Sequence, residues 1–155
     1  MSFSFFNGKK MKKNHKGIVL YNEKIAKDTY KIVLKTDMEE AYGGQFISIL
    51  CENKTLRRPF SIASFDGNEI GVLFKLKGKG TEFLSNLRAG DEIDFVGAVG
   101  NGFNIETVKS LLIGAGVGVA PVFYLKTDLR KMQIPSLLIP WFQTQKELPE
   151  NLKRQ

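Results

Sequence analysis

The chain has 155 residues, of which 43% are hydrophobic and 25% are charged, and its formal net charge is +7. This length suits one complete folded core with a fragment of a second. The composition excludes a disordered chain, and no apolar run reaches the ~20 residues that cross a bilayer. The single cysteine excludes a disulfide and a four-cysteine metal site within this chain. The single histidine, which lies in the basic N-terminal segment, argues against a hydrolase that needs a histidine base.

The chain begins with a basic segment, residues 1–16, which contains five lysines and His15. Such a segment can bind nucleic acid or anionic lipid. We expect a solvated tail instead, because no nucleic-acid-binding motif and no interleaving of aromatic and basic residues follow it. We therefore expect no nucleic acid or membrane partner, and the absence of a secretory signal pattern predicts a cytoplasmic location.

Short strands separated by turn residues are predicted between residues 17 and 105. Six runs carry the β-branched and aromatic residues of strands: 17–21, 29–34, 45–50, 60–64, 70–76 and 92–96. Cys51 directly follows the third run, at the end of the apolar stretch that begins at Phe46, and is predicted to be a small core or rim residue. One helix is predicted over residues 81–87, with Thr81 as a candidate cap. Six strands at this spacing indicate a small antiparallel barrel or sandwich.

The hydrophobic pattern changes after residue 105. Residues 110–113 form a continuous apolar run, which is typical of a strand buried on both faces. A glycine-rich turn, a predicted helix over residues 121–132 and a second apolar run at 136–139 follow. This order predicts a β-α-β unit of a parallel sheet, and because one unit cannot bury both faces of its sheet, residues 106–155 form an unfinished second domain.

Three motifs carry candidate chemistry. Arg57, Arg58, Pro59, Phe60 and Ser61 are consecutive, and a strand-borne arginine can grip a diphosphate, although two adjacent arginines are more often a solvated pair. Residues 77–81, Lys-Gly-Lys-Gly-Thr, precede the short helix and offer backbone amides to a phosphate, with a plain hairpin turn as an equal alternative. Residues 114–121, Gly-Ala-Gly-Val-Gly-Val-Ala-Pro, join a strand to a helix as nucleotide-binding turns do, but with irregular glycine spacing.

In order and spacing these motifs resemble the ferredoxin–NADP reductase superfamily, and within it the family of dihydroorotate dehydrogenase electron transfer subunits. The resemblance rests on LRRPFSIA, GKGTEFLSNLRAGDEIDFVGAVGNGF and LLIGAGVGVAPVFYL. It implies a six-stranded antiparallel Greek-key barrel that binds FAD over residues 17–105, followed by a truncated NAD(P)-binding domain. The family's C-terminal half, with its four [2Fe–2S] cysteines, is missing from this chain.

The resemblance also implies which residues bind the cofactors. For FAD they are Arg58, Pro59, Phe60, Ser61, Leu73, Phe74, Lys75, Gly80 and Thr81. For the nicotinamide nucleotide they are Gly114, Gly116, Gly118, Ala120 and Pro121. No catalytic acid or base and no metal site is expected.

The implied function is transfer of reducing equivalents from NADH through flavin to a partner, the catalytic dihydroorotate dehydrogenase subunit of pyrimidine biosynthesis. The motifs leave open a related hydrogenase, sulfide dehydrogenase or sulfite reductase as the partner. They also leave open a non-catalytic FAD-binding or interaction module, so enzymatic activity of this chain is not decided by its sequence.

Overall fold

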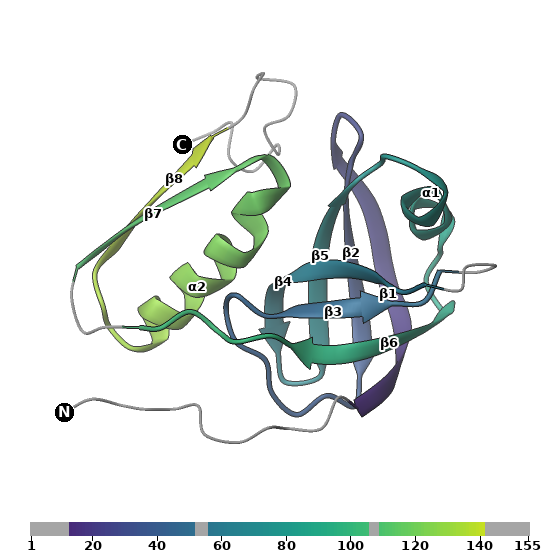
Figure 1. Ribbon diagram of the computed structural model, residues 1–155, viewed down its shortest axis with the longest axis horizontal. Helices are drawn as coiled ribbons and strands as arrows, with labels where there is room; N and C mark the ends of the chain where they lie inside the picture. The colour runs from purple at the N-terminus through teal and green to yellow at the C-terminus, as the bar shows by residue number, and fades with distance from the viewer. Residues whose placement is uncertain (1–12, 52–55, 106–108, 142–155) are drawn as a thin grey trace.

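The computed structural model describes residues 13–51, 56–105 and 109–141. These residues form a closed β-barrel and, beside it, a small α/β unit with two parallel strands (Figure 1). Helix α2 of the small unit lies between its own two-stranded sheet and the barrel, where it contacts strand β4 (Figure 1). No helix in the described part of the chain is long and apolar enough to span a membrane.

The barrel confirms all six predicted strands. They are β1 (Lys13–Ala26), β2 (Thr29–Thr36), β3 (Phe46–Ile49), β4 (Arg58–Asp66), β5 (Glu69–Lys75) and β6 (Glu92–Val99). Every pairing is antiparallel, and the order around the barrel is β1-β2-β5-β4-β3-β6. Strands β3, β4 and β5 follow one another as neighbours and β2 lies beside β5, so the prediction of a Greek key is also confirmed.

The barrel interior is filled by inward-facing side chains of alternating strand positions. Ile32, Leu34, Ile47, Ile62 and Phe95 are among those with no exposed surface. Each alternates with more exposed neighbours along its strand, as a half-buried strand requires. This alternation assigns each predicted site residue on β4 and β5 to the inside or the outside of the barrel.

Helix α1 (Lys79–Asn86) covers one end of the barrel and begins two residues before the predicted helix. Its N-cap is Gly78, and Thr81 is the third residue of the helix. The Thr81 hydroxyl accepts the backbone N–H groups of Lys77 and Gly78 at 2.9 and 3.1 Å. Thr81 therefore closes the turn from inside the helix, and its predicted place at the cap was wrong.

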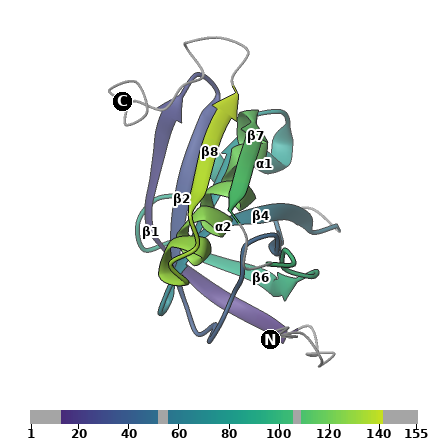
Figure 2. The same ribbon diagram turned by 90° about the vertical axis from the view of Figure 1, so that its left-hand side faces the viewer.

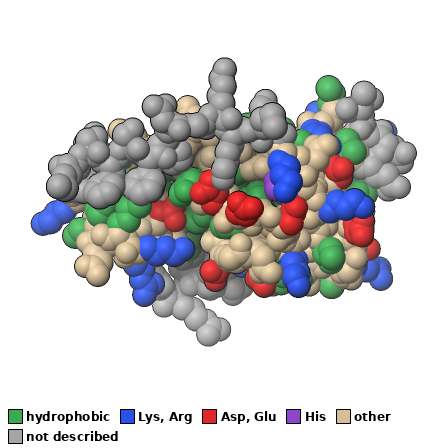
Figure 3. Space-filling view, turned by 90° about the horizontal axis from the view of Figure 1, so that it is seen from below, with side chains coloured by type: hydrophobic (Ala, Val, Ile, Leu, Met, Phe, Trp, Pro, Cys, Tyr) green, Lys and Arg blue, Asp and Glu red, His purple; other side chains and the backbone are tan. Residues whose placement is uncertain are grey.

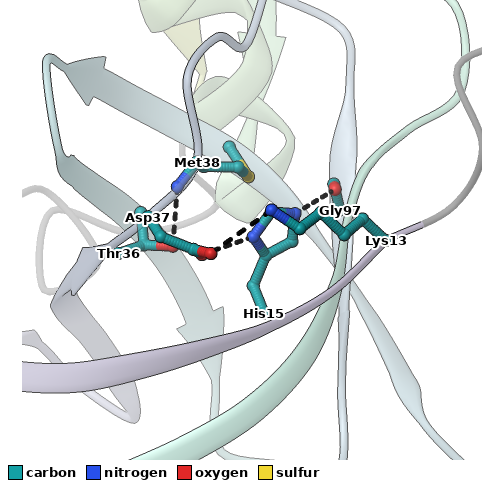
Figure 4. Close-up of polar contacts among 6 residues, drawn as sticks. All are labelled: Lys13, His15, Thr36, Asp37, Met38 and Gly97. Atoms are coloured by element: carbon teal, nitrogen blue, oxygen red, sulfur yellow. Dashed lines mark hydrogen bonds and ion pairs between the residues drawn. The ribbon is translucent and has the colours of Figure 1, made fainter.

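The barrel begins four residues earlier than predicted. Strand β1 starts at Lys13 and pairs with β6 from Lys13 to Ile18, so residues 13–16 belong to the sheet and not to a solvated tail. His15 is buried, stacks on Phe95 and has both ring nitrogens near acceptors: Nδ1 lies 2.6 Å from Asp37 Oδ1 and Nε2 lies 3.0 Å from the Gly97 carbonyl (Figure 4). Residues 1–12 lie outside the described part.

The small unit has the predicted strand–helix–strand order. It consists of β7 (Ser110–Ala115), the 3-10 turn η1 (Gly116–Gly118), α2 (Val119–Lys131) and β8 (Ser136–Trp141), and β7 and β8 pair in parallel with Leu111 opposite Leu137. The predicted domain boundary at residue 106 lies outside the described residues.

Within the part of the chain that the structure describes, one face of this sheet is covered. Helix α2 packs against both strands, whereas Leu111, Ile113, Leu137, Ile139 and Trp141 are 43–65% exposed on the opposite face. Figure 2 looks toward this side of the molecule, with β7 and β8 in front. The run at 110–113 is of the kind found in strands buried on both faces, but α2 is the one described element that packs on the sheet, which agrees with the expectation that a single β-α-β unit cannot bury both faces.

Candidate functional site

The first two motifs meet at the end of the barrel that α1 covers. A Cβ atom added to Gly80 would lie 3.5 Å from Arg58 Cγ and 3.8 Å from Arg58 Nε, with Cys51 Sγ at 3.4 Å. Cys51 is buried there, as predicted for a core or rim residue. Arg58 and Gly80, which are separated by 22 positions in the sequence, therefore lie side by side.

The two adjacent arginines have different surroundings. Arg57 forms an ion pair with Asp94, and its guanidinium also donates to the Asp94 carbonyl at 3.2 Å, which attaches the start of β4 to β6. Arg58 is exposed and stands beside the first turn of α1. The structure therefore separates a bracing arginine from one that is available to a ligand.

The start of α1 has the features of a phosphate-binding turn. The first N–H groups of a helix have no partner within the helix and carry positive partial charge. Gly80 has no side chain to cover them, and the Arg58 guanidinium lies beside it. Lys77 and Lys79 add positive charge on the same connection, whereas Glu82 is the acidic residue of the first turn. A diphosphate fits this combination of charge and open backbone.

The α1 turn depends on a residue that sequence reasoning missed. Asn22 of β1 donates through Nδ2 to the carbonyls of Leu84 and Leu87 at 2.8 and 3.0 Å. These bonds attach the end of α1 to the barrel wall. No local pattern marks Asn22, because its partners lie more than 60 positions away in the chain.

The other predicted flavin residues divide between two sides of the barrel wall. Phe74 is buried and stacks on Tyr30, and Phe60 meets Phe74 edge to face with ring centres 6.0 Å apart. Phe74 therefore offers a cofactor its backbone and not its ring. By strand alternation, Pro59 and Ser61 of β4 face outward, as do Leu73 and Lys75 of β5. By the same alternation Arg58 shares its face with Phe60 and Ile62, so it reaches Gly80 at the end of the barrel and not from the outer surface of β4 and β5.

The glycine-rich turn of the small unit lies close to this surface, because η1 contacts β5 and α2 contacts β4. The three glycines of this turn have different surroundings. Gly114 is buried, and an added Cβ would lie 2.7 Å from Val119 Cα, so Gly114 allows α2 to pack against β7. An added Cβ at Gly116 or Gly118 would meet no atom within 4 Å.

Ala120 and Pro121 belong to the first turn of α2, where the sequence placed Pro121. Ala120 is fully buried and packs the helix against its surroundings. Of the five predicted nucleotide residues, Gly114 and Ala120 are packing positions, Gly116 and Gly118 have open surroundings, and Pro121 lies in the first turn of α2. Among the residues that the structure describes, no cluster of three or more metal-ligating side chains is present.

Comparisons with known proteins identify relatives for this arrangement. The chain is 36% identical over 121 residues to the electron transfer subunit of dihydroorotate dehydrogenase B from Caldanaerobacter subterraneus, and 38% identical over 120 residues to that from Clostridium acetobutylicum. These matches cover 77% and 75% of this chain but 49% and 48% of the relatives. The chain thus spans about half the length of these relatives. No family model matches it.

Solved structures show the same fold. An NADH-dependent reduced ferredoxin–NADP oxidoreductase superposes with a TM-score of 0.77 at 28% identity, over 86% of this chain and 50% of that one. The Amycolatopsis cytochrome P450 reductase GcoB superposes with a TM-score of 0.80 at 22% identity, over 91% of this chain and 46% of its own. The barrel, α1 and the adjoining β-α-β unit are therefore a shared architecture.

Proposed function

Because this chain is homologous to the electron transfer subunits of dihydroorotate dehydrogenase B and belongs with them to the ferredoxin–NADP reductase superfamily, we propose that it binds FAD and acts in an electron-transfer flavoprotein. The close approach of Arg58 to Gly80 carries the proposal. It combines a guanidinium, an open helix start and a position without a side chain, which together suit the diphosphate of FAD.

Each part of the chain has a distinct task in this proposal. Arg58 and the first amides of α1 hold the diphosphate. The outward side chains of β4 and β5, including Ser61 and Leu73, support the flavin ring. Bound FAD would supply the redox chemistry, accepting a hydride and releasing electrons singly. The chain would position this group and bring the uncrowded backbone of Gly116 and Gly118 near it through the contact of η1 with β5.

The reductant and the acceptor are further parts of the proposal. NADH as the electron donor is supported by the position of the glycine-rich turn beside β5. The catalytic subunit of a dihydroorotate dehydrogenase as the acceptor is supported by the names of the relatives. The donor and the acceptor are both taken from proteins about twice the length of this chain, so each is tested separately.

A substitution of Arg58 tests FAD binding. We expect the purified wild-type chain to hold one FAD and Arg58→Gln to bind it about 10–150-fold more weakly, because a charge-assisted hydrogen bond contributes roughly 1.5–3 kcal/mol. Arg88→Gln is the matched control, since Arg88 lies after α1 on an exposed loop, and it should change the affinity less than about twofold. Affinity is measured by flavin fluorescence quenching. Equal affinity in both variants would remove Arg58 from the site.

Anaerobic addition of NADH to the FAD-loaded chain tests the donor separately. Bleaching of the oxidised-flavin absorbance supports NADH oxidation by this chain. Persistent yellow colour with retained FAD supports the alternative of a non-catalytic FAD-binding module. The exposed apolar face of β7 and β8 favours that alternative, because parallel sheets are ordinarily covered on both faces.

A further inference from the structure

Two hydrogen bonds attach the second half of α2 to the barrel. The Tyr124 hydroxyl donates to the Ala41 carbonyl at 2.6 Å, and an Asp128 carboxylate oxygen accepts the Gly43 N–H at 3.0 Å. Ala41 and Gly43 belong to the connection between β2 and β3. We call these two bonds the α2 joint. They hold the helix near its C-terminal end, whereas the glycine-rich turn η1 lies at its other end.

Gly43 brings the backbone of this connection directly against the helix. A Cβ atom added to Gly43 would lie 2.9 Å from both the Cα and the N atom of Leu125, so any side chain there would push α2 away. The Gly43 carbonyl also accepts the Phe103 N–H at 2.8 Å, from the segment that follows β6. The joint therefore connects the helix to two separate parts of the barrel.

The joint lies at the edge of an open space. Helix α2 also packs on β4, but a cavity of about 780 Å³ separates other parts of the two units. Figure 3 shows the molecule from below, with acidic side chains beside hydrophobic ones on that face. Residues across a cavity make no contact with each other, so the orientation of α2 depends more strongly on its two bonds. The cavity is lined by residues 39–43, 65–67, 103–105, 124, 128, 131, 132 and 134.

Both side chains of the joint are withdrawn from water. Burial raises the pKa of Tyr124, so its hydroxyl keeps the proton that it donates to Ala41. Burial also raises the pKa of Asp128, against which the bond from the Gly43 N–H acts in the opposite direction. Loss of either bond leaves a polar group without a partner in these surroundings.

Small rotations at the joint become large displacements at η1. Ten residues separate Gly118 from Asp128, which is about 15 Å of helix, so a tilt of ~10° about Asp128 would move the turn by about 2.5 Å. Hydride transfer requires the reacting atoms to lie roughly 3–3.5 Å apart, and a misplacement of ~1 Å can reduce its rate about 100-fold. A tilt of α2 would therefore affect the reaction strongly.

We propose that Tyr124 and Asp128 are positioning residues for the reduction of flavin by a nicotinamide nucleotide: they fix α2 on the barrel and thereby fix where η1 lies against β5. The inference rests on the proposed function, in which Gly116 and Gly118 receive the nucleotide. It assigns a role in the reaction to two side chains that lie at the far end of α2 from this turn.

The test compares two ways of loosening the joint. Asp128→Ala removes the acceptor, and Gly43→Ala forces the helix away while keeping the carboxylate. In stopped-flow measurements on the FAD-loaded chain, we expect each variant to lower the limiting rate of flavin reduction at saturating NADH about 10–100-fold. FAD affinity should change less than about twofold, because the Arg58–Gly80 site lies elsewhere.

Two controls separate positioning from other effects. Asp128→Asn keeps an oxygen that can accept the Gly43 N–H, so it should retain the limiting rate within about threefold. Asp66→Ala removes an exposed acid that lines the same cavity but has no bond to α2 among the described residues, and it should change nothing. Wild-type rates in Asp128→Ala and Gly43→Ala, or a parallel loss of FAD affinity, would overturn the proposal.

A second readout needs no cofactor. Trp141, the single tryptophan of the chain, lies on β8 of the small unit. In time-resolved fluorescence anisotropy of the cofactor-free protein, Asp128→Ala and Gly43→Ala should add a fast decay from motion of this unit on the barrel, and Asp128→Asn should not. If the wild-type chain binds no FAD, or holds FAD that NADH does not reduce, the proposed function fails and the anisotropy alone decides. An added fast decay in both loosened variants then supports the joint, and decays equal to the wild type overturn it.

Discussion

Replacing Gly80 with alanine should stabilise the chain and weaken its binding of FAD. The added methyl group would lie 3.4–3.8 Å from Cys51 and Arg58, which is ordinary van der Waals contact, so nothing in the protein has to move. Gly80 is the second residue of α1, where alanine is the better helix former. We expect the free energy of unfolding without cofactor to rise by about 0.5–1 kcal/mol.

The same methyl group fills the space where a phosphate oxygen would meet Arg58 and the helix amides. Losing one charge-assisted hydrogen bond costs roughly 1.5–3 kcal/mol, which corresponds to about 10–150-fold weaker FAD binding. The two effects have opposite signs. A variant that is merely misfolded cannot produce this combination, because it would be less stable and not more.

Two measurements separate these effects. Urea unfolding of the cofactor-free chain gives the stability, and flavin fluorescence titration gives the affinity. Unchanged FAD affinity in a folded Gly80→Ala variant would refute the assignment of this turn to the diphosphate. Lower stability without cofactor would refute the local geometry on which the argument depends.

Three further predictions concern other parts of the molecule. Gly114→Ala should destabilise the small unit by about 1–3 kcal/mol in thermal unfolding, because its Cβ would lie 2.7 Å from the backbone of α2, whereas Gly118→Ala meets nothing within 4 Å and should be nearly neutral. Asp37→Asn should lower the free energy of unfolding measured in urea, because the hydrogen bond from His15 holds the pKa of Asp37 below its ordinary value of 3.8. The loss of stability should be full above about pH 4 and should vanish as the pH falls through the lowered pKa. A loss that persists at low pH would contradict this cause. Ile113→Lys should reduce self-association of the purified chain in sedimentation velocity, because Ile113 is 64% exposed on an uncovered apolar face, and unchanged association would show that this face is not used.

The strands of the barrel could be predicted because turn residues and β-branched residues are local signals. The start of β1 could not. Its inward positions there are His15 and Gly17, neither of which marks a buried strand, and the groups that stabilise His15 are Asp37 and the Gly97 carbonyl. Burial of a histidine depends on partners that only the folded chain brings near.

The residues of the candidate site could be predicted from the sequence, but the way they come together could not. The sequence indicated Arg58 and Gly80 as phosphate ligands, but their contact depends on the packing of α1 over the barrel end, which Asn22 secures from a distant strand. Phe74 was expected beside the cofactor because of the family resemblance. Strand alternation turns its ring into the core, where it stacks on Tyr30, so only its backbone is offered to a cofactor.

The pairing of β1 with β6 has a consequence for biosynthesis. Residue 13 is matched with residue 97, so β1 leaves the ribosome long before its second neighbour, β6. At ~5–20 residues per second, that wait is on the order of 10 s. During this time one edge of β1 has unpaired backbone groups, which chaperones can bind or which can pair with the wrong strand. Slow synthesis or low temperature during expression should therefore affect the yield of this protein more than that of a helical protein of equal size.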